Sequence, residues 1–165
     1  MPPPSVILEL RHTGHTLGFA AEIASAAATG DRPVLLALNA AARGSTQMAE
    51  VDLPDAVQIR WLDAGNADYL SVEQGLLELR TIAELLRDLE SARLSLPTAD
   101  ALLHALTRAP EARAIERTLP PLDLIVHWPL AAQVPTGLST LREALGGAAE
   151  LRAVRRHRVL TVDPY

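Results

Sequence analysis

Short apolar runs alternate with helix-forming segments from the start of the chain, and this alternation limits the possible folds more than any other feature. Residues 5–10 and 33–38 are apolar runs of the length typical of buried strands. Between them, residues 16–28 are rich in alanine and stop before Gly30, as expected of a helix that ends at a glycine. A strand, a helix and a strand within 38 residues predict a βαβ unit, whose crossover requires parallel strands.

The remainder of the chain continues this alternation. Further strands are expected at residues 57–61 and 122–128, and residues 150–156 and 158–162 are expected to pair as a terminal hairpin. These elements predict one domain over residues 1–165: a three-layer Rossmann-like α/β sandwich with a mostly parallel sheet of about five strands.

A helical insert is expected over residues 71–119, between the third and fourth strands. Its first helix is expected to begin with a capping box made by Ser71 and Gln74 and to end near Leu94. Thr98 is expected to cap a second helix, and Pro110 to open a third at the position where a helix tolerates proline.

Composition excludes several kinds of chemistry. The 165 residues include no cysteine, which excludes disulfides, thiolate zinc sites, iron–sulfur clusters and a cysteine nucleophile. All 15 basic residues are arginine, and the formal net charge of −5 argues against general nucleic-acid binding. No apolar run is long enough to cross a membrane, and residues 1–5 lack the basic start of a signal peptide, so a cytoplasmic location is expected.

Ligands of such folds bind at the carboxyl ends of the strands, which directs attention to the loops at residues 11–16, 39–56 and 128–139. The first of these loops carries the sequence Arg11-His12-Thr13-Gly14-His15 immediately before a helix. A helix N-terminus presents unpaired N–H groups and suits a phosphate, and Gly14 would let a ligand approach the backbone. Two histidines there could stabilise charge on a departing pyrophosphate.

The sequence from His12 to His15 resembles the motif of the HxGH nucleotidyltransferase superfamily, which includes phosphopantetheine and nicotinamide-mononucleotide adenylyltransferases. The resemblance implies that His12 and His15 are the catalytic pair, that the substrate is a nucleotide, and that Mg²⁺ accompanies it. It extends to Ser139, Thr140 and Arg142, which would contact the triphosphate at the start of a later helix. The chain departs from the family in lacking lysine, so phosphate contacts would fall on Arg11, Arg142, histidine or backbone N–H groups.

Other functions stay open. Residues 14–38 resemble the first unit of GT-B glycosyltransferases, which implies an acceptor-binding subunit of a split enzyme. The size and layout are similar to those of CRISPR-associated domains that sense or degrade cyclic oligonucleotides, which would implicate His12, Thr13, His127 and residues 128–139. A non-catalytic interaction protein is the third alternative. The wide apolar face of the helix at residues 71–94 is expected to belong to the core, with a homodimer interface as the alternative.

Two weaker features complete the list of candidates. Arginines at residues 152–158 form either a phosphate-binding edge or a charged edge strand that blocks unwanted pairing. Glu9, His12 and His15 could in principle hold a metal, but Glu9 alternates with apolar residues on its strand and no second histidine cluster follows, so no metal site is expected. The chain has no Gly-x-Ser-x-Gly elbow, Walker loop or GxGxxG sequence.

Overall fold

The computed structural model describes residues 3–12, 15–30, 32–65, 67–68, 71–89, 92–126 and 156–161. By their internal contacts the residues divide into two compact units, which are described separately below. Unit 1 comprises Met1–Asn66 and Glu84–Pro97, and unit 2 comprises Ala67–Ala83 and Thr98–Tyr165.

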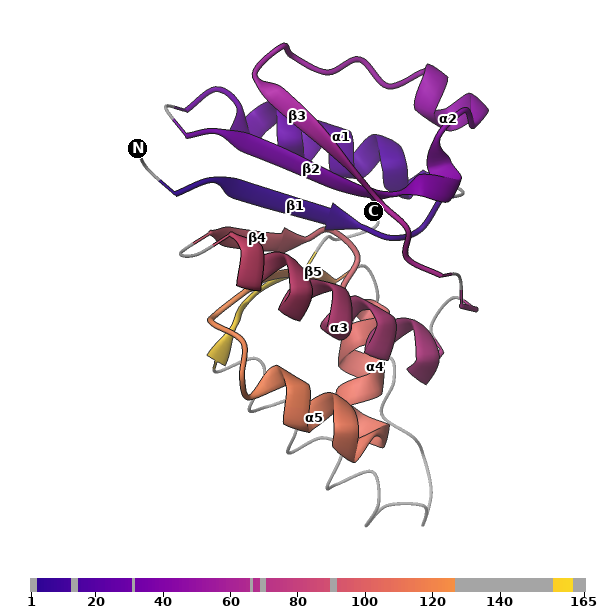
Figure 1. Ribbon diagram of the computed structural model, residues 1–165, viewed down its shortest axis with the longest axis vertical. Coiled ribbons are helices and arrows are strands. Elements are labelled where there is room, and N and C mark those ends of the chain that lie inside the picture. Colours follow the sequence, from indigo (N-terminus) through magenta and orange to yellow (C-terminus); the bar gives the residue numbers. More distant parts are fainter. Residues whose placement is uncertain are drawn as a thin grey trace. The chain divides into compact units, whose positions relative to one another are not determined.

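The fold is α/β and Rossmann-like, as the sequence predicts (Figure 1). Six strands form the sheet in the order β3-β2-β1-β4-β5-β6, and each pair whose register is described is parallel. The strands are β1 (Ser5–Glu9), β2 (Val34–Asn39), β3 (Val57–Leu62), β4 (Arg93–Leu96), β5 (Asp123–Val126) and β6 (Arg158–Thr161). The helices are α1 (Thr16–Ala27), the 3₁₀ turn η1 (Ala40–Ala42), α2 (Thr46–Ala49), α3 (Val72–Asp88), α4 (Asp100–Arg108) and α5 (Pro110–Glu116).

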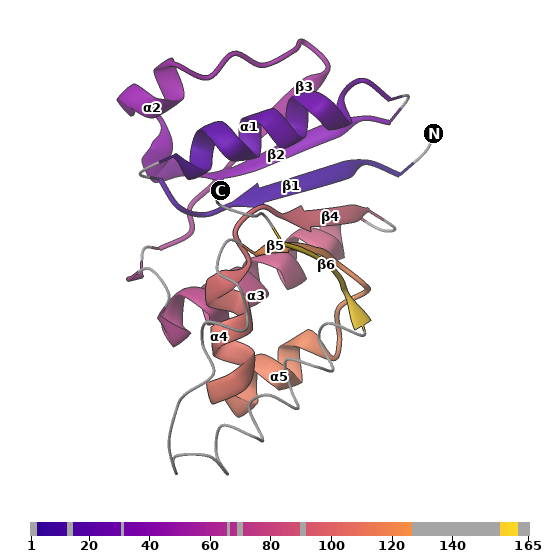
Figure 2. The same ribbon diagram turned by 180° about the vertical axis from the view of Figure 1, so that it is seen from behind.

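Unit 1 is built on β1, which pairs with β2 on one side and with β4 on the other. Helix α1 packs on β1 and β2, and both views show it lying along these strands (Figures 1 and 2). The buried side of α1 consists of Thr16, Leu17, Ala20, Ala21 and Ala24, and these mostly small side chains let the helix lie close to the sheet. Leu17, Ile7, Leu36 and Leu38 belong to one buried apolar cluster, which therefore holds the start of α1 against the sheet.

The fourth strand corrects the prediction that a helix runs to about Leu94. Helix α3 ends at Asp88, and β4 follows at Arg93–Leu96, so the sheet has six strands rather than about five. Leu94 and Leu96 are buried, whereas Arg93 is exposed and Ser95 half-buried. This alternation is the period of a strand, and it was obscured because the leucines continue the apolar pattern of the preceding helix.

The capping predictions are confirmed in part. Ser71 Oγ accepts the Gln74 N–H at 3.0 Å, but the Gln74 side chain donates to Glu78 Oε1 at 3.0 Å, so only half of a capping box forms. Helix α4 has Ala99 rather than Thr98 as its N-cap, and α5 begins with Pro110 as expected.

The expected loop at residues 39–56 contains two short helical segments, η1 and α2. Asn39 Oδ1 accepts the Ala41 N–H at 3.0 Å, and Ser45 Oγ accepts the Met48 N–H at 3.1 Å. These caps explain how a segment without apolar periodicity becomes ordered, because each satisfies an N–H group that a helix start leaves without an intrahelical partner.

Unit 2 contains β5 and β6, the helices α4 and α5, and the first part of α3. Gly75 of α3 lies against α4 so closely that a Cβ atom there would stand 2.2 Å from the Ala101 carbonyl oxygen. The expected terminal hairpin is wrong in two respects: Arg156 is helical, and β6 pairs with β5 in parallel. Among the described helices of both units, none is long and apolar enough to cross a membrane.

Candidate functional site

The carboxyl ends of β1 and β4 mark the place where the strand order of the sheet reverses. The chain passes from β1 outward to β2 and β3, and then returns to place β4 on the other side of β1. In open parallel sheets, ligands bind in the crevice beside this reversal. The loop that leaves β1 at this point is the one that carries His12 and His15.

Glu9 and Arg11 form an ion pair at the end of β1. The Glu9 side chain is 2% exposed, and its Oε1 accepts the Arg11 backbone N–H at 2.8 Å while lying 3.6 Å from Arg11 Nε. A buried carboxylate needs such partners, because isolated charge is costly to remove from water. Arg11, expected to contact phosphate, therefore already has a carboxylate partner within the fold.

His12 and His15 lie at the entrance to α1. His12 is half-buried, and His15 is exposed and occupies the N-cap position of the helix. The His15 side chain makes no capping hydrogen bond, and the first turn of α1 contains no acidic residue. Thr13 and Gly14, which complete the motif, lie outside the described residues. His15 thus supplies no side-chain cap to α1, and the helix dipole at this end favours an anion.

Gly18 in the first turn of α1 has no packing reason to be a glycine. It is exposed, and a Cβ atom built there meets no other atom within 4 Å. A glycine inside a helix costs roughly 1 kcal/mol relative to alanine. What the glycine does provide is a bare stretch of backbone near the helix start, where a ligand could approach closely.

Asn39 joins the carboxyl ends of three strands of unit 1, β1, β2 and β3. Its Nδ2 group donates to the Leu10 carbonyl at 3.1 Å and to the Gly65 carbonyl at 3.3 Å, while its Oδ1 accepts the Ala41 N–H. The residue is 2% exposed, so it serves the scaffold rather than a ligand. The chain segments that follow β1, β2 and β3 are therefore held together by a single side chain.

The sequence reasoning missed Arg43 and Trp61. Arg43 follows η1 at the carboxyl end of β2, and its guanidinium carbon lies 5.1 Å from the centroid of the Trp61 ring on β3. This distance is within the range of a cation–π contact. The one available signal was an arginine beside a glycine in the loop after the second strand, and Gly44 indeed has a positive φ of 83°.

The remaining candidate residues belong to the later part of the chain. Ser139, Thr140, Arg142, His127 and residues 128–139 lie outside the described residues. No group of three or more His, Asp or Glu side chains placed to hold a metal ion occurs in the described part of the chain.

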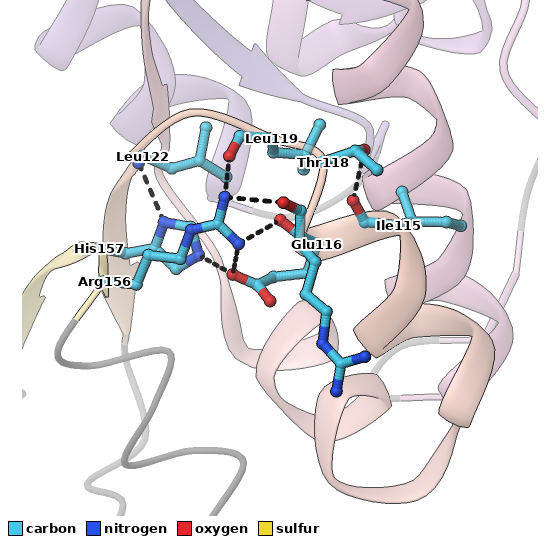
Figure 3. A network of polar contacts seen from close by, with 8 residues as sticks. Ile115, Glu116, Thr118, Leu119, Leu122, Arg156 and His157 are labelled. Carbon is cyan, nitrogen blue, oxygen red and sulfur yellow. Dashed lines mark hydrogen bonds and ion pairs between the residues drawn. The ribbon is translucent and has the colours of Figure 1, made fainter.

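The described residues of the C-terminal basic cluster bind other parts of unit 2. Arg158 Nε lies 2.8 Å from Asp123 Oδ1 on the neighbouring strand, and Arg156 Nη1 lies 2.8 Å from Glu116 Oε1. Arg156 also donates to the carbonyl groups of Glu116, Arg117 and Leu119 (Figure 3). Their charges are matched by carboxylates, so these residues fit the charged edge strand better than the phosphate-binding edge.

His157 lies inside the same network. Its Nδ1 accepts the Leu122 N–H at 3.0 Å and its Nε2 lies 3.0 Å from Glu116 Oε1, so both ring nitrogens have partners (Figure 3). Its side chain is fully buried. Burial lowers the pKa of His157, and the nearby Arg156 charge adds to this effect, while Glu116 acts in the opposite direction. The neutral ring with its proton on Nε2 satisfies both contacts.

Comparison with known proteins yields no relative: no family model, no curated protein and no solved structure matches this chain.

Proposed function

We propose that unit 1 binds a phosphate group of a nucleotide or similar small molecule at the start of α1, and that the chain transfers a nucleotidyl group. The observation that carries the proposal is the position and charge of the N-terminus of α1. It lies at the strand-order reversal, has no capping side chain from His15, and has no acidic residue in its first turn. Backbone N–H groups and the positive end of a helix dipole, at the edge of the sheet where ligands of such folds bind, are suited to phosphate.

The proposed reaction is attack by a phosphate or similar nucleophile on the α-phosphate of a nucleoside triphosphate. A new P–O bond forms, the bond to the pyrophosphate breaks, and the pyrophosphate leaves with the electron pair. His12 and His15 would donate hydrogen bonds to the phosphate oxygens as their negative charge increases. The chemistry needs no covalent intermediate, in keeping with a chain that has neither cysteine nor lysine.

Mg²⁺ is proposed only as the counter-ion that enters with the triphosphate. Glu9, the buried carboxylate at the end of β1, already interacts with Arg11, and the described residues offer no group of three or more ligands. Mg²⁺ commonly binds through substrate phosphates and retains several waters, so it does not require a cage made by the protein.

Thermal-shift measurements with ATP, CTP and inorganic phosphate, with and without Mg²⁺, test the proposal. We expect ATP or CTP to raise the melting temperature of the wild-type protein and expect His15→Ala to abolish most of that shift. His104→Ala is the matched control, because His104 lies on α4 in unit 2. Release of pyrophosphate in the presence of a phosphorylated acceptor would then test the transfer step.

The same panel separates the other functions. Stabilisation by cyclic oligoadenylates alone would support a cyclic-oligonucleotide sensor, and stabilisation by UDP-sugars or sugar acceptors alone would support a glycosyltransferase subunit. If no phosphate compound stabilises the wild-type protein, phosphate binding is wrong and a non-catalytic interaction protein is favoured.

A further inference from the structure

Arg43 lies at the same edge of the sheet as the start of α1, and its charged side chain is held there by the Trp61 ring. Arg43 is exposed, and no ion pair or hydrogen bond of its guanidinium is found with any described residue. Arg11, the other arginine near the carboxyl ends of β1 and β2, is held by Glu9. Arg43 is therefore the guanidinium at this edge whose charge is not matched by a carboxylate.

The contact with Trp61 does not occupy Arg43 with a hydrogen-bond acceptor. The guanidinium carries five N–H donors, and among the described residues none of them is engaged by a carboxylate or carbonyl group. The ring also restricts the side chain, so less conformational freedom is lost when an anion binds. A guanidinium in this state suits two parallel hydrogen bonds to a phosphate or carboxylate.

Strand register relates this pair to the start of α1. Glu9, Leu38 and Trp61 are successive partners across β1, β2 and β3. Trp61 thus lies two strand spacings, about 10 Å, from the end of β1. Leu17 in the first turn of α1 and Ala42 next to Arg43 belong to the same apolar cluster against which Trp61 packs. Asn39 fixes the chain leading to Arg43 against the Leu10 carbonyl.

We propose that Arg43, supported by Trp61, binds a second anionic group of the ligand whose first phosphate lies at the start of α1. The inference rests on the proposed function and assigns to Arg43 the contact with the further phosphates of the triphosphate, so an extended phosphate chain should bind better than a single phosphate. Trp61, which supports Arg43, lies about two strand spacings from the end of β1, a separation that an extended phosphate chain spans and a lone phosphate does not.

Binding affinities of Arg43→Ala for ATP and for inorganic phosphate test this inference by isothermal titration. We expect the ATP affinity to fall about ten-fold or more, in line with the loss of charge-assisted hydrogen bonds. The affinity for inorganic phosphate should change less than about two-fold, since that ligand would bind at α1 alone. Arg32→Ala is the matched control, because it removes an exposed arginine from the amino end of β2 in the same unit.

Trp61 fluorescence gives a second readout. The chain has two tryptophans, so Trp128→Phe leaves Trp61 as the sole emitter. We expect ATP, but not inorganic phosphate, to change the emission. If the wild-type protein binds ATP while Arg43→Ala leaves its affinity unchanged, the inference is overturned and the proposed function stands. If the wild-type protein binds neither ligand, both fall together.

Discussion

The Leu122 N–H donates to His157 Nδ1 at 3.0 Å, and this hydrogen bond joins the start of β5 to the start of β6. Because Nδ1 is the acceptor, it must carry no proton. The other ring nitrogen, Nε2, faces the Glu116 carboxylate, which also accepts a hydrogen bond from Arg156 (Figure 3). A second proton on the ring would set two N–H donors against each other at Nδ1. The charged groups around His157 are Glu116 and Arg156 at close range, with the Arg158–Asp123 pair on the adjoining strands.

Acidification is therefore expected to destabilise the protein. Burial lowers the pKa of His157 in the folded state below its ordinary value of 6.5. The stabilisation that neutral His157 provides is fully present above pH 6.5. It is lost as the pH falls from 6.5 toward the folded-state pKa, because His157 binds a proton more readily in the unfolded chain. Urea unfolding at pH 7.5 and pH 5.5 measures this loss.

His157→Asn provides the control for that experiment. It should lower the free energy of unfolding at pH 7.5 by about 1–3 kcal/mol, since buried partners lose their hydrogen bonds. It should also reduce the dependence on pH. Burial lowers the pKa of His104 too, with a contribution from Arg108, so some dependence should persist. An unchanged dependence in His157→Asn would contradict the role given to this residue.

Asn39→Ala should destabilise unit 1 more than an ordinary surface change. It removes the donor to the Leu10 and Gly65 carbonyls and the acceptor of the Ala41 N–H. We expect a loss of roughly 2–3 kcal/mol, because at least one buried group is left without its partner. Asn39→Asp keeps only the acceptor and faces two carbonyls with a carboxylate, so it should be no better than alanine. Urea unfolding of both variants measures the difference, and a loss below 0.5 kcal/mol for each would argue against the linkage.

Gly18→Ala should raise stability and weaken ligand binding at the same time. The new methyl group meets no atom within 4 Å, and alanine favours the helix by roughly 1 kcal/mol. The methyl group would, however, cover the backbone proposed to approach a phosphate. Thermal melting with and without ATP measures both effects. Ala26→Gly, on the exposed part of the same helix, should lower stability without affecting the ATP-induced shift.

Gly75→Ala should have the opposite effect on stability. Its Cβ would stand 2.2 Å from the Ala101 carbonyl oxygen and 2.5 Å from the Ala105 Cβ, so α3 and α4 must move apart. Overpacking of this kind costs about 1–3 kcal/mol. Thermal melting compares the variant with Gly18→Ala, which makes the same substitution in open space. Equal melting temperatures for the two variants would show that the close approach at Gly75 is not required.

Sequence periodicity and helix-capping residues predicted the elements whose formation depends on neighbouring residues in the chain. The βαβ start, the Ser71 cap and the position of Pro110 follow from periodicity and from residue chemistry, and each is confirmed. Strand β4 was missed because the leucines near its start fit a helix as well as a strand, and pairing with β1 decides between the two. The parallel pairing of β6 is likewise a long-range choice that its alternating sequence does not contain.

The candidate site divides in the same way. The position of His15 at a helix start could be predicted from the sequence, because the loop and helix are adjacent in the chain. The ion pair between Arg11 and Glu9 was harder to predict from the sequence, because it depends on the burial of Glu9 at the end of β1. The contact of Arg43 with Trp61 joins the end of η1 to β3 across the intervening α2 segment, and no spacing rule brings the two residues together.

The central position of β1 has a consequence for how the protein is made. Ser5 pairs with Val34 on one side but with Arg93 on the other, so during synthesis β1 keeps an open edge until the chain has been extended as far as Arg93. Pairing between such distant residues slows folding, and unpaired strand edges promote aggregation. Fragments that end before Leu96 should therefore associate with themselves or with chaperones, even though they contain the entire βαβ start and every residue of the proposed phosphate site that the structure describes.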